Sequence, residues 1–470
     1  MAQAEIGLIG LGVMGANLAL NIAENEFPIA VYNRTGETTT KFHADAGALA
    51  DRIVPCQTLE ELVAAIKPPH PVIIMVKAGE PVDEQIARLR PLMSAGDIII
   101  DAGNANFRDT IRRFAELAGS GIAFIGMGVS GGEEGARHGP SMMVGSTRQS
   151  YARVEHVLTA ISAKYEGEPC VAWLGTDGAG HFVKTIHNGI EYADMQMIAE
   201  VYGILRDGLG MGAKEIGKIF ASWNGGRLNS FLIEITARVL ATEDQKTGLP
   251  LVDIIVDRAG QKGTGKWSVI EAQMLGVPAT AIEAAVAARG LSSMKSKRET
   301  ADAAYGIANS PIAATHKDDL VRHLEAALYA GKIAAYAQGF AILENASVEF
   351  GWKLPLAKIA EIWRAGCIIR SQFLGLMAKT FGAAASQGNL LLAPDFVTMM
   401  KDTHGSLRQI VAAAAMAGLP VPALSSALSY FDSYRQNRGT ANLIQGQRDF
   451  FGAHGFERIG ETGTHHGVWV

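Results

Sequence analysis

The chain has 470 residues, of which 48% are apolar and 19% are charged, and its formal net charge is −5. This length exceeds that of one ordinary domain, so we expect two or three domains with a large core. The negative balance argues against a general nucleic-acid-binding protein, which needs a basic surface. The three cysteines, Cys56, Cys170 and Cys367, are far apart and cannot all pair, which favours a reducing cytoplasm.

Neither a membrane segment nor a metal site is predicted. The first residues, MAQAEIGLIG, carry no basic stretch before their apolar residues, so we expect no signal peptide. The most membrane-like run, 410–424, is short and is interrupted by Pro420 and Pro422. The histidines show neither an HExxH motif nor a CxxC-to-histidine spacing, and therefore no metal is expected.

The first predicted elements are a short strand, EIGLI, a glycine-rich turn and a helix. Gly10 permits the tight turn, Gly12 lets the backbone approach a pyrophosphate, and Gly15 lets the helix pack against the strand. A GxGxxG motif alone is weak, but a strand before it and a helix after it strengthen it. The pattern indicates a dinucleotide-binding fold of the Rossmann type.

A second predicted strand, IAVYN, ends at Asn33, Arg34 and Thr35. Proteins that bind NAD commonly place a carboxylate here, where it accepts the ribose 2′-hydroxyl and would repel a 2′-phosphate. The acid is absent in this chain and an arginine follows, which favours NADP. The alternative is that Arg34 is an ordinary surface charge.

The next predicted strands, PVIIMVKAG and GDIIIDAGN, place Lys77 and Asn104 just beyond strand ends. Ligands of open α/β sheets bind at this edge. A further strand, IAFIGMGV, leads into the loop formed by Ser130, Gly131 and Gly132.

From about residue 179 the alternation of strands and helices gives way to consecutive helices. Helical periodicity extends over 179–207, 329–348 and 355–380. We therefore expect an α/β Rossmann-type domain over 1–178, a large all-α domain over 179–434 and an extended tail over 435–470. The spacing of Ile, Trp and Gly at 219, 223 and 226 recurs at 359, 363 and 366, which we interpret as a candidate internal duplication.

The segment KTIHNGIEY, residues 184–192, places Lys184, His187, Asn188 and Glu191 on one helical face, because their offsets are three, four and seven. Gly189 costs about 1 kcal/mol relative to alanine in a helix interior. Close approach by another backbone or by a ligand would offset that cost. Taken alone, the stripe is explained equally well as a solvated polar face.

A rival function comes from Gly260, Gly265 and Lys266, which nearly match a phosphate-binding P-loop. Trp267 occupies the position of the required Ser or Thr, and an indole cannot ligate Mg²⁺. This substitution argues against a nucleotide hydrolase. Lys262, Lys266, Thr264 and the nearby glycines of this loop could still bind a substrate phosphate through donors alone.

The tail from about Gln436 is rich in glycine and shows no sustained helical period. Chain ends of this kind are often disordered. Its apolar residues are nevertheless too numerous to leave in water, so we expect the tail to dock on another surface: Leu443, Ile444, Phe450, Phe451, Phe456 and Trp469.

The chain resembles the decarboxylating 6-phosphogluconate dehydrogenase family over its full length. The motifs that carry the resemblance are GLGVMG, NRT, VKAG, GVSGGEEGAR, HFVKTIHNGIEYADMQ, DRAGQKGTGKW and QRDFFGAH. The resemblance implies oxidation of 6-phosphogluconate by NADP, loss of CO₂ and formation of ribulose 5-phosphate in the pentose phosphate pathway. A catalytically inactive relative that only binds NADP is the alternative, which intact Lys184, Glu191 and Lys262 disfavour.

The resemblance also implies roles for individual residues. Lys184 becomes the proton acceptor and Glu191 the proton donor, and Gly189 is then expected to admit substrate or nicotinamide. The implied substrate contacts are Asn104, Ser130, Gly131, Gly132, His187, Asn188, Tyr192, Lys262, Arg289, Arg448 and His454. The implied NADP contacts are Gly10, Leu11, Gly12, Val13, Met14, Gly15, Asn33, Arg34, Thr35, Met75, Val76, Lys77 and Asn104.

The resemblance finally implies a homodimer. In the family, the tail reaches into the partner subunit and completes its active site. Each site is then expected to take Arg448 and His454 from the neighbouring chain.

Overall fold

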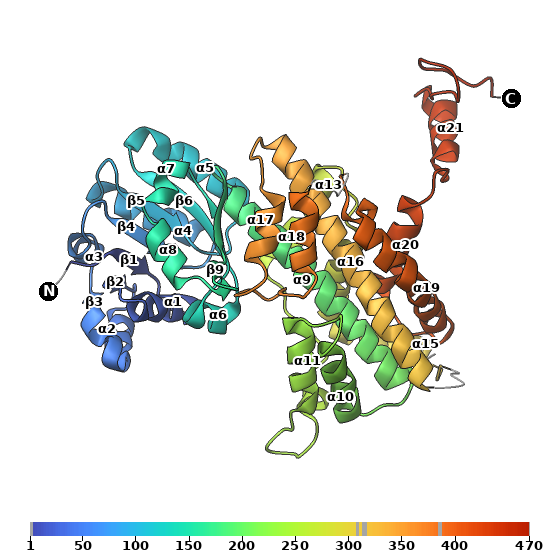
Figure 1. Ribbon diagram of the computed structural model, residues 1–470, viewed down its shortest axis with the longest axis horizontal. Helices are drawn as coiled ribbons and strands as arrows, with labels where there is room; N and C mark the ends of the chain where they lie inside the picture. The colour runs from blue at the N-terminus through green and yellow to red at the C-terminus, as the bar shows by residue number, and fades with distance from the viewer. Residues whose placement is uncertain (1–2, 307–309, 313–316, 384–387, 470) are drawn as a thin grey trace.

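The computed structural model describes residues 3–306, 310–312, 317–383 and 388–469. Figure 1 shows an α/β unit at the N-terminal end, a bundle of helices beside it, and helix α21 standing away from both. The predicted fold class, a Rossmann-type unit followed by a large helical unit, is confirmed.

The α/β unit is built on an eight-stranded sheet with the order β10-β7-β6-β5-β4-β1-β2-β3. Every neighbouring pair is parallel except β6 and β7, which are antiparallel. The strands are β1 Ile6–Ile9, β2 Ile29–Tyr32, β3 Ile53–Cys56, β4 Pro71–Ile74, β5 Ile98–Asp101, β6 Ala123–Val129, β7 Met142–Gly145 and β10 Val171–Gly175. A small hairpin consists of β8 Lys164–Tyr165 and β9 Glu168–Pro169.

Helices cover both faces of this sheet. The helices are α1 Val13–Glu24, α2 Gly36–Asp45, α3 Leu59–Ala65, α4 Glu80–Leu89, α5 Phe107–Leu117, α6 Gly132–His138, α7 Arg148–Ala152 and α8 Glu155–Ile161. One apolar core joins Ile6 and Leu8 to α1 and α8, and a second joins Ile9 to α3 and α4. Alternate side chains of β1 thus enter different layers, as the period of a strand requires.

The strand order reverses direction between β1 and β4, because β2 and β3 lie on one side of β1 and β4 lies on the other. Ligands of doubly wound sheets bind at such a reversal, beyond the carboxyl ends of the strands. The glycine-rich turn after β1 and the loop after β4 meet there.

The second unit begins with α9, Ala179–Gly203, which is extended by a π-helical turn over Ile204–Gly208. The helices that follow are α10 Ala213–Asn224, α11 Phe231–Ala241, α12 Leu251–Ile254, α13 Gly263–Met274, α14 Thr280–Ser292, α15 Lys295–Tyr305, α16 Lys317–Glu349, α17 Leu356–Ile362, α18 Leu374–Gly382, α19 Pro394–Met416 and α20 Pro422–Tyr434. Helix α9 packs on α13, α14 and α16, and also on strands β6 and β7.

Glycines allow α9 to lie directly on the sheet. A Cβ at Gly180 would be 2.6 Å from both the Gly126 carbonyl and the Gly145 amide. A Cβ at Gly128 would overlap the side chain of Lys184. The N-terminal half of α9 is therefore buried between the two units, and its polar residues are buried with it.

Two sequence predictions in the helical unit are wrong. Residues 355–380 do not form one helix, because α17 ends at Ile362 and α18 starts at Leu374. Between them Gly366 adopts a φ of +66°, and its carbonyl accepts a hydrogen bond from the Ser141 amide of the α/β unit at 2.7 Å. The chain therefore leaves the helix here and contacts the α/β unit instead.

The second error concerns Gly189. A Cβ there would lie 2.6 Å from Oγ of Ser268 on α13 and 3.3 Å from a methyl of Ile282 on α14. The glycine therefore permits close helix packing, and it does not open the site to substrate or nicotinamide.

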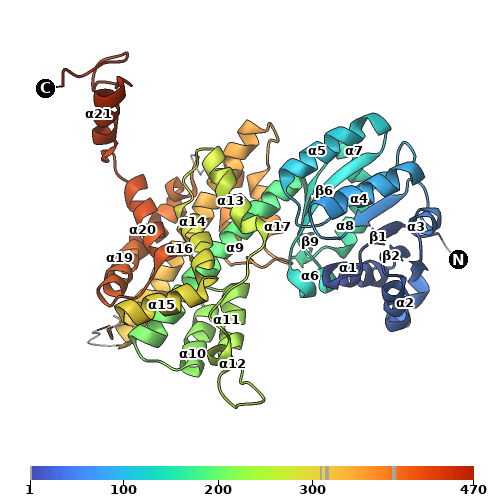
Figure 2. The same cartoon turned by 180° about the vertical axis from the view of Figure 1, so that it is seen from behind.

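The tail also differs from its prediction, because Ala441–Gly452 form a regular helix, α21. Its apolar side chains Leu443, Phe450 and Phe451 are about two-thirds exposed, at 66%, 66% and 72%. Figures 1 and 2 both show α21 projecting away from the body. The short helical period was hidden by glycines at 446 and 452.

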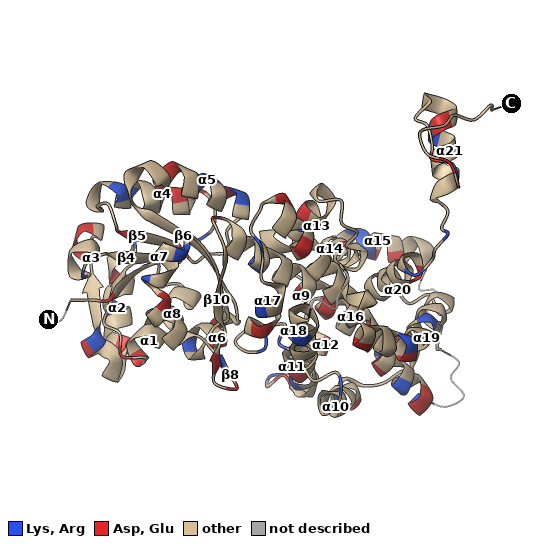
Figure 3. Cartoon of the chain, turned by 45° about the horizontal axis from the view of Figure 1, so that its top comes forward, with Lys and Arg blue, Asp and Glu red and all other residues tan. Residues whose placement is uncertain are grey.

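The two segments with the repeated Ile, Trp and Gly spacing begin in α10 and α17 and extend beyond the ends of these helices. Each of the two helices packs on the helix that follows it. Internal duplication stays a prediction. No helix within the described ranges is long and apolar enough to cross a membrane. Figure 3 shows basic and acidic residues interspersed along the helices of both units.

We predict that the buried ion pair between Lys332 on α16 and Asp194 on α9 is essential for stability. Both side chains are at most 2% exposed. Lys332→Met leaves an uncompensated buried carboxylate and should lower the free energy of unfolding by about 3–5 kcal/mol. Arg322→Met, on the same helix, removes an exposed pair with Asp319 and should cost less than about 1 kcal/mol. Urea unfolding measures both, and equal losses would contradict the prediction.

Candidate active site

A pocket of about 610 Å³ lies where the glycine-rich turn faces the helical unit. The α/β unit lines it with three loops, at 12–15, 75–78 and 102–104, together with Val129. The helical unit contributes the start of α13 through Lys262, Gly263, Thr264 and Trp267. Neither unit alone encloses this space.

The turn after β1 suits a pyrophosphate. Gly10 has a φ of +99°, and a Cβ at Gly15 would overlap the Gly10 carbonyl, so neither position accepts a side chain. A Cβ at Gly12 would meet no atom within 4 Å, which leaves its backbone open toward the pocket. No side chain caps the N-terminus of α1, so its amide groups are available to an anion.

The three residues after β2 differ in their contacts. The side-chain oxygen of Asn33 accepts a hydrogen bond from the Leu11 amide at 3.1 Å and so braces the glycine-rich turn. Arg34 and Thr35 are exposed beside it. Arg34 is therefore free to reach a group bound over the turn.

A chain of hydrogen bonds runs through the helical stripe. Nζ of Lys184 donates to Oγ of Ser130 at 3.0 Å, and this hydroxyl lies 3.2 Å from Nε2 of His187. Nδ1 of His187 lies 3.0 Å from the side-chain oxygen of Asn188, whose amide donates to Oγ1 of Thr264 at 2.9 Å. The chain therefore joins the acid–base candidates to α13, which lines the pocket.

The surroundings of His187 determine its protonation state. Burial first, and the charge of Lys184 second, hold its pKa well below the ordinary value, so the imidazole is neutral. Its Nδ1–H then donates to Asn188, and Nε2 accepts from the Ser130 hydroxyl. The Ser130 oxygen remains free to accept from Lys184, and every link has one donor and one acceptor.

Burial shifts the two acid–base candidates in opposite directions. It lowers the pKa of Lys184, which nearby Glu191 partly opposes. It raises the pKa of Glu191, which Lys184, Arg289 and Lys262 partly oppose. A lysine that loses its proton readily and a glutamic acid that retains it are suited to general base and general acid roles.

Basic residues lie around Tyr192, the residue that follows Glu191. The guanidinium of Arg289 is 4.1 Å from the centre of the Tyr192 ring, and the Tyr192 hydroxyl accepts a hydrogen bond from the Lys262 amide at 3.2 Å. A Cβ at Gly265 would overlap the same ring. Two cations and a phenol therefore converge near the pocket and can receive an anionic substrate.

The structure brings most of the predicted residues together. Ser130 is buried, Gly131 and Gly132 have positive φ angles, and Asn104 is exposed at the pocket wall. Arg448 and His454 are separate, because both belong to the projecting tail and are exposed there. A single chain does not place these two beside Lys184.

Trp267, Gly103 and Gly128 are site residues that sequence reasoning did not predict. Trp267 and Gly103 line the pocket, and Gly128 admits Lys184 against the sheet. Thr264, predicted as a candidate donor to a phosphate, ends the hydrogen-bond chain. Alternation of Gly126 and Gly128 on one strand was a usable signal, since both lie on the same sheet face. Within the described ranges, no three His, Cys, Asp or Glu side chains gather as a metal site.

Comparisons with known proteins agree on one family. The family model of the NAD binding domain of 6-phosphogluconate dehydrogenase matches residues 5–175, and that of its C-terminal domain matches 180–469. The chain is 47% identical to the NADP⁺-dependent decarboxylating enzyme of Bacillus subtilis over 100% of both chains. It is 45% identical to the NAD⁺-dependent enzyme of the same organism over 99% of both.

A solved structure is similar over nearly the whole fold. The 6-phosphogluconate dehydrogenase of Plasmodium falciparum, described with its cofactor NADP⁺ and its substrate 6-phosphogluconate, is 41% identical. The match covers 99% of this chain and 100% of that chain, with a TM-score of 0.95.

We predict that Arg34 selects the cofactor. Arg34→Ala should weaken NADP⁺ binding by about 1.5–3 kcal/mol, the size of a hydrogen bond to a charged group. NAD⁺ binding should change little, because NAD⁺ lacks the 2′-phosphate. Titration of the variant with both cofactors measures the difference, and equal losses would contradict the assignment.

Proposed function

The chain belongs to the 6-phosphogluconate dehydrogenase family, and we propose that Lys184 and Glu191 perform the proton transfers of its reaction. The enzyme oxidises 6-phosphogluconate with NADP⁺ and releases CO₂ and ribulose 5-phosphate. The observation that best supports the proposed roles is the buried hydrogen-bond chain from Lys184 to Thr264 beside the dinucleotide pocket.

The oxidation step needs a base at the C3 hydroxyl. The glycine-rich turn at 12–15 and the loop at 75–78 would hold NADP⁺, which would supply the acceptor for the hydride that leaves C3. The neutral amine of Lys184 takes the hydroxyl proton, and its lowered pKa makes that form accessible. Ser130 and neutral His187 hold the amine in place through the contacts at 3.0 and 3.2 Å.

The decarboxylation step uses the same lysine as an acid. The new C3 ketone is β to the C1 carboxylate, so it receives the electron pair when the C1–C2 bond breaks. The Lys184 ammonium donates a hydrogen bond to the carbonyl oxygen and stabilises the developing enolate. Glu191 lies seven residues, about 10 Å, further along α9 and protonates the carbon that has lost CO₂.

Different residues bind the different groups of the substrate. Lys262 and Arg289 from the helical unit meet one anionic group, and Asn104, Ser130 and the following glycines approach from the α/β unit.

We also propose three domains with different roles. Residues 1–178 bind the cofactor, 179–434 bind the substrate and form the dimer, and 435–470 form the tail. The three cysteines are free and buried, which fits a reducing cytoplasm.

A homodimer completes the proposed site. The exposed apolar side chains of α21 need a surface, and the body offers exposed Ile255, Val256 and Leu291 close in sequence to Lys262 and Arg289. A second copy supplies both surfaces at once, with the tail of one chain on the body of the other. Arg448 and His454 would then enter the partner's site.

We predict that Lys184→Met abolishes oxidation while 6-phosphogluconate still binds. Loss of a general base costs about 10²–10⁴-fold in rate. Glu191→Gln should reduce turnover less completely, because the enediol can be protonated from water. NADPH absorbance and released CO₂ measure the reaction, and calorimetry measures binding. Lys218→Met, an exposed lysine on α10, is the control. Unchanged turnover in Lys184→Met would overturn the assignment.

Mixing inactive variants tests the shared site. Lys184→Met and Arg448→Ala homodimers should each be inactive. After subunit exchange, one site of each heterodimer carries both lesions and the other carries neither. Random pairing should restore up to about a quarter of the wild-type activity. Exchange shown by mass spectrometry without recovered activity would mean that each tail serves its own chain.

A further inference from the structure

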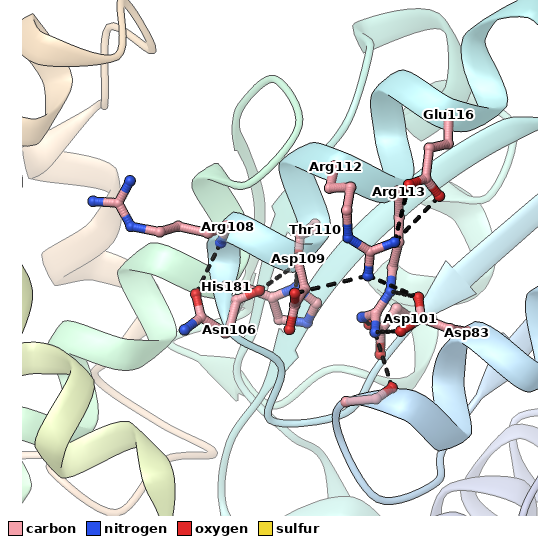
Figure 4. Close-up of polar contacts among 11 residues, drawn as sticks. Asp83, Asp101, Asn106, Arg108, Asp109, Thr110, Arg112, Arg113, Glu116 and His181 are labelled. Atoms are coloured by element: carbon pink, nitrogen blue, oxygen red, sulfur yellow. Dashed lines mark hydrogen bonds and ion pairs between the residues drawn. The ribbon is translucent and has the colours of Figure 1, made fainter.

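A buried arginine outside the acid–base cluster connects the loops that line the dinucleotide pocket. Arg113 lies on α5, and its side chain is 1% exposed. Figure 4 shows its guanidinium between Asp83 and Asp101. A guanidinium carries five donors in a rigid fork, so burying it requires several acceptors in fixed positions.

Three residues supply these acceptors. The two carboxylate oxygens of Asp83 accept hydrogen bonds at 2.7 and 3.0 Å. Oδ2 of Asp101 accepts one at 3.1 Å, and the carbonyl of Gly79 accepts one at 2.9 Å. One side chain thereby fixes the relative positions of α4, the end of β5 and the loop that precedes α4.

Two of these acceptors belong to pocket loops. Gly79 closes the loop that carries residues 75–78, and Asp101 directly precedes residues 102–104, which line the opposite side. Oδ1 of Asp101 also accepts a hydrogen bond from the Gly103 amide at 3.1 Å. A Cβ at Gly103 would be 3.3 Å from the Val76 carbonyl, so the loops touch. The guanidinium therefore sets how the two walls of the pocket meet.

We propose that Arg113 is a positioning residue for NADP: it holds the loops at 75–79 and 101–104 in the geometry that binds the cofactor. This inference rests on the proposed assignment of the pocket to NADP. A buried ion pair with a purely structural role would change stability alone. A positioning role changes cofactor affinity in a folded protein and weakens the binding of 6-phosphogluconate less, because Asn104 is the one proposed substrate contact on these loops.

Arg113→Lys tests the proposal, because lysine keeps the charge but cannot donate to Asp83, Asp101 and Gly79 together. Its Kd for NADPH, from a fluorescence titration, should rise about tenfold or more, as expected for one charge-assisted hydrogen bond lost. The KM for 6-phosphogluconate should rise by a clearly smaller factor than the Kd for NADPH, because Asn104 is the one proposed substrate contact on these loops. An unchanged Kd, or equal rises in both constants, would overturn the proposal.

Arg112→Lys is the matched control, because it makes the same substitution at a neighbouring arginine. Arg112 is the preceding residue of α5, is 43% exposed, and bonds Asp83 and Glu116 without touching either loop. This variant also keeps its charge, and it should leave the Kd for NADPH unchanged. If circular dichroism shows that Arg113→Lys does not fold, Asp83→Asn is the alternative variant. It weakens the hydrogen bonds between Asp83 and the Arg113 guanidinium, and it should also raise the Kd for NADPH.

Gly12→Glu tests the pocket separately. The position has room for a side chain, and the added carboxylate would repel the pyrophosphate. Lost NADPH binding in Gly12→Glu with unchanged binding in Arg113→Lys and Asp83→Asn overturns only the role of Arg113. Unchanged binding in Gly12→Glu overturns the pocket assignment and the inference with it.

Discussion

The close contact of α9 with strands β6 and β7 is the constraint on which the site depends. Gly126, Gly128, Gly145 and Gly180 provide no side chains at the points where the helix meets the sheet. A Cβ at any of them would push the helix outward and expose Lys184 to water. The lowered pKa of Lys184 comes from burial, so the same glycines that set the packing also set the chemistry.

Burial of Lys184, Ser130 and His187 is tolerated because each has a hydrogen-bond partner of the right kind. Neutral His187 donates a hydrogen bond from Nδ1 to Asn188 and accepts one at Nε2 from the Ser130 hydroxyl. The oxygen of Ser130 can therefore accept a hydrogen bond from Lys184. Arg113 and Lys332 are as deeply buried, and both face carboxylates. Such networks cost little only when complete, and they specify one arrangement of the units over others.

The division of labour between the two units follows from their shapes. The α/β unit ends its strands in short loops that suit a dinucleotide, while α13 closes the pocket and brings Thr264 and Lys262. The bidentate pair between Arg108 on α5 and Glu271 on α13, at 2.9 and 2.7 Å, ties the units next to this pocket. The proposed cofactor and substrate contacts consequently lie at a junction of the two units, where small movements of either unit alter the pocket.

The sequence by itself determined the elements whose signals are local. The turn at Gly10–Gly15, strands β1, β2, β4, β5 and β6, and the spacing of Lys184, His187, Asn188 and Glu191 depend on neighbours within a few residues, and all could be predicted. Strands β3, β7 and β10 were not predicted. The tertiary structure decided what depends on distant partners. Gly189 packs on Ser268, the 355–380 segment breaks where Gly366 meets Ser141, and the positions of Thr264 and Arg113 become functional only after folding. These contacts join residues of different elements, and no short pattern in the sequence encodes them.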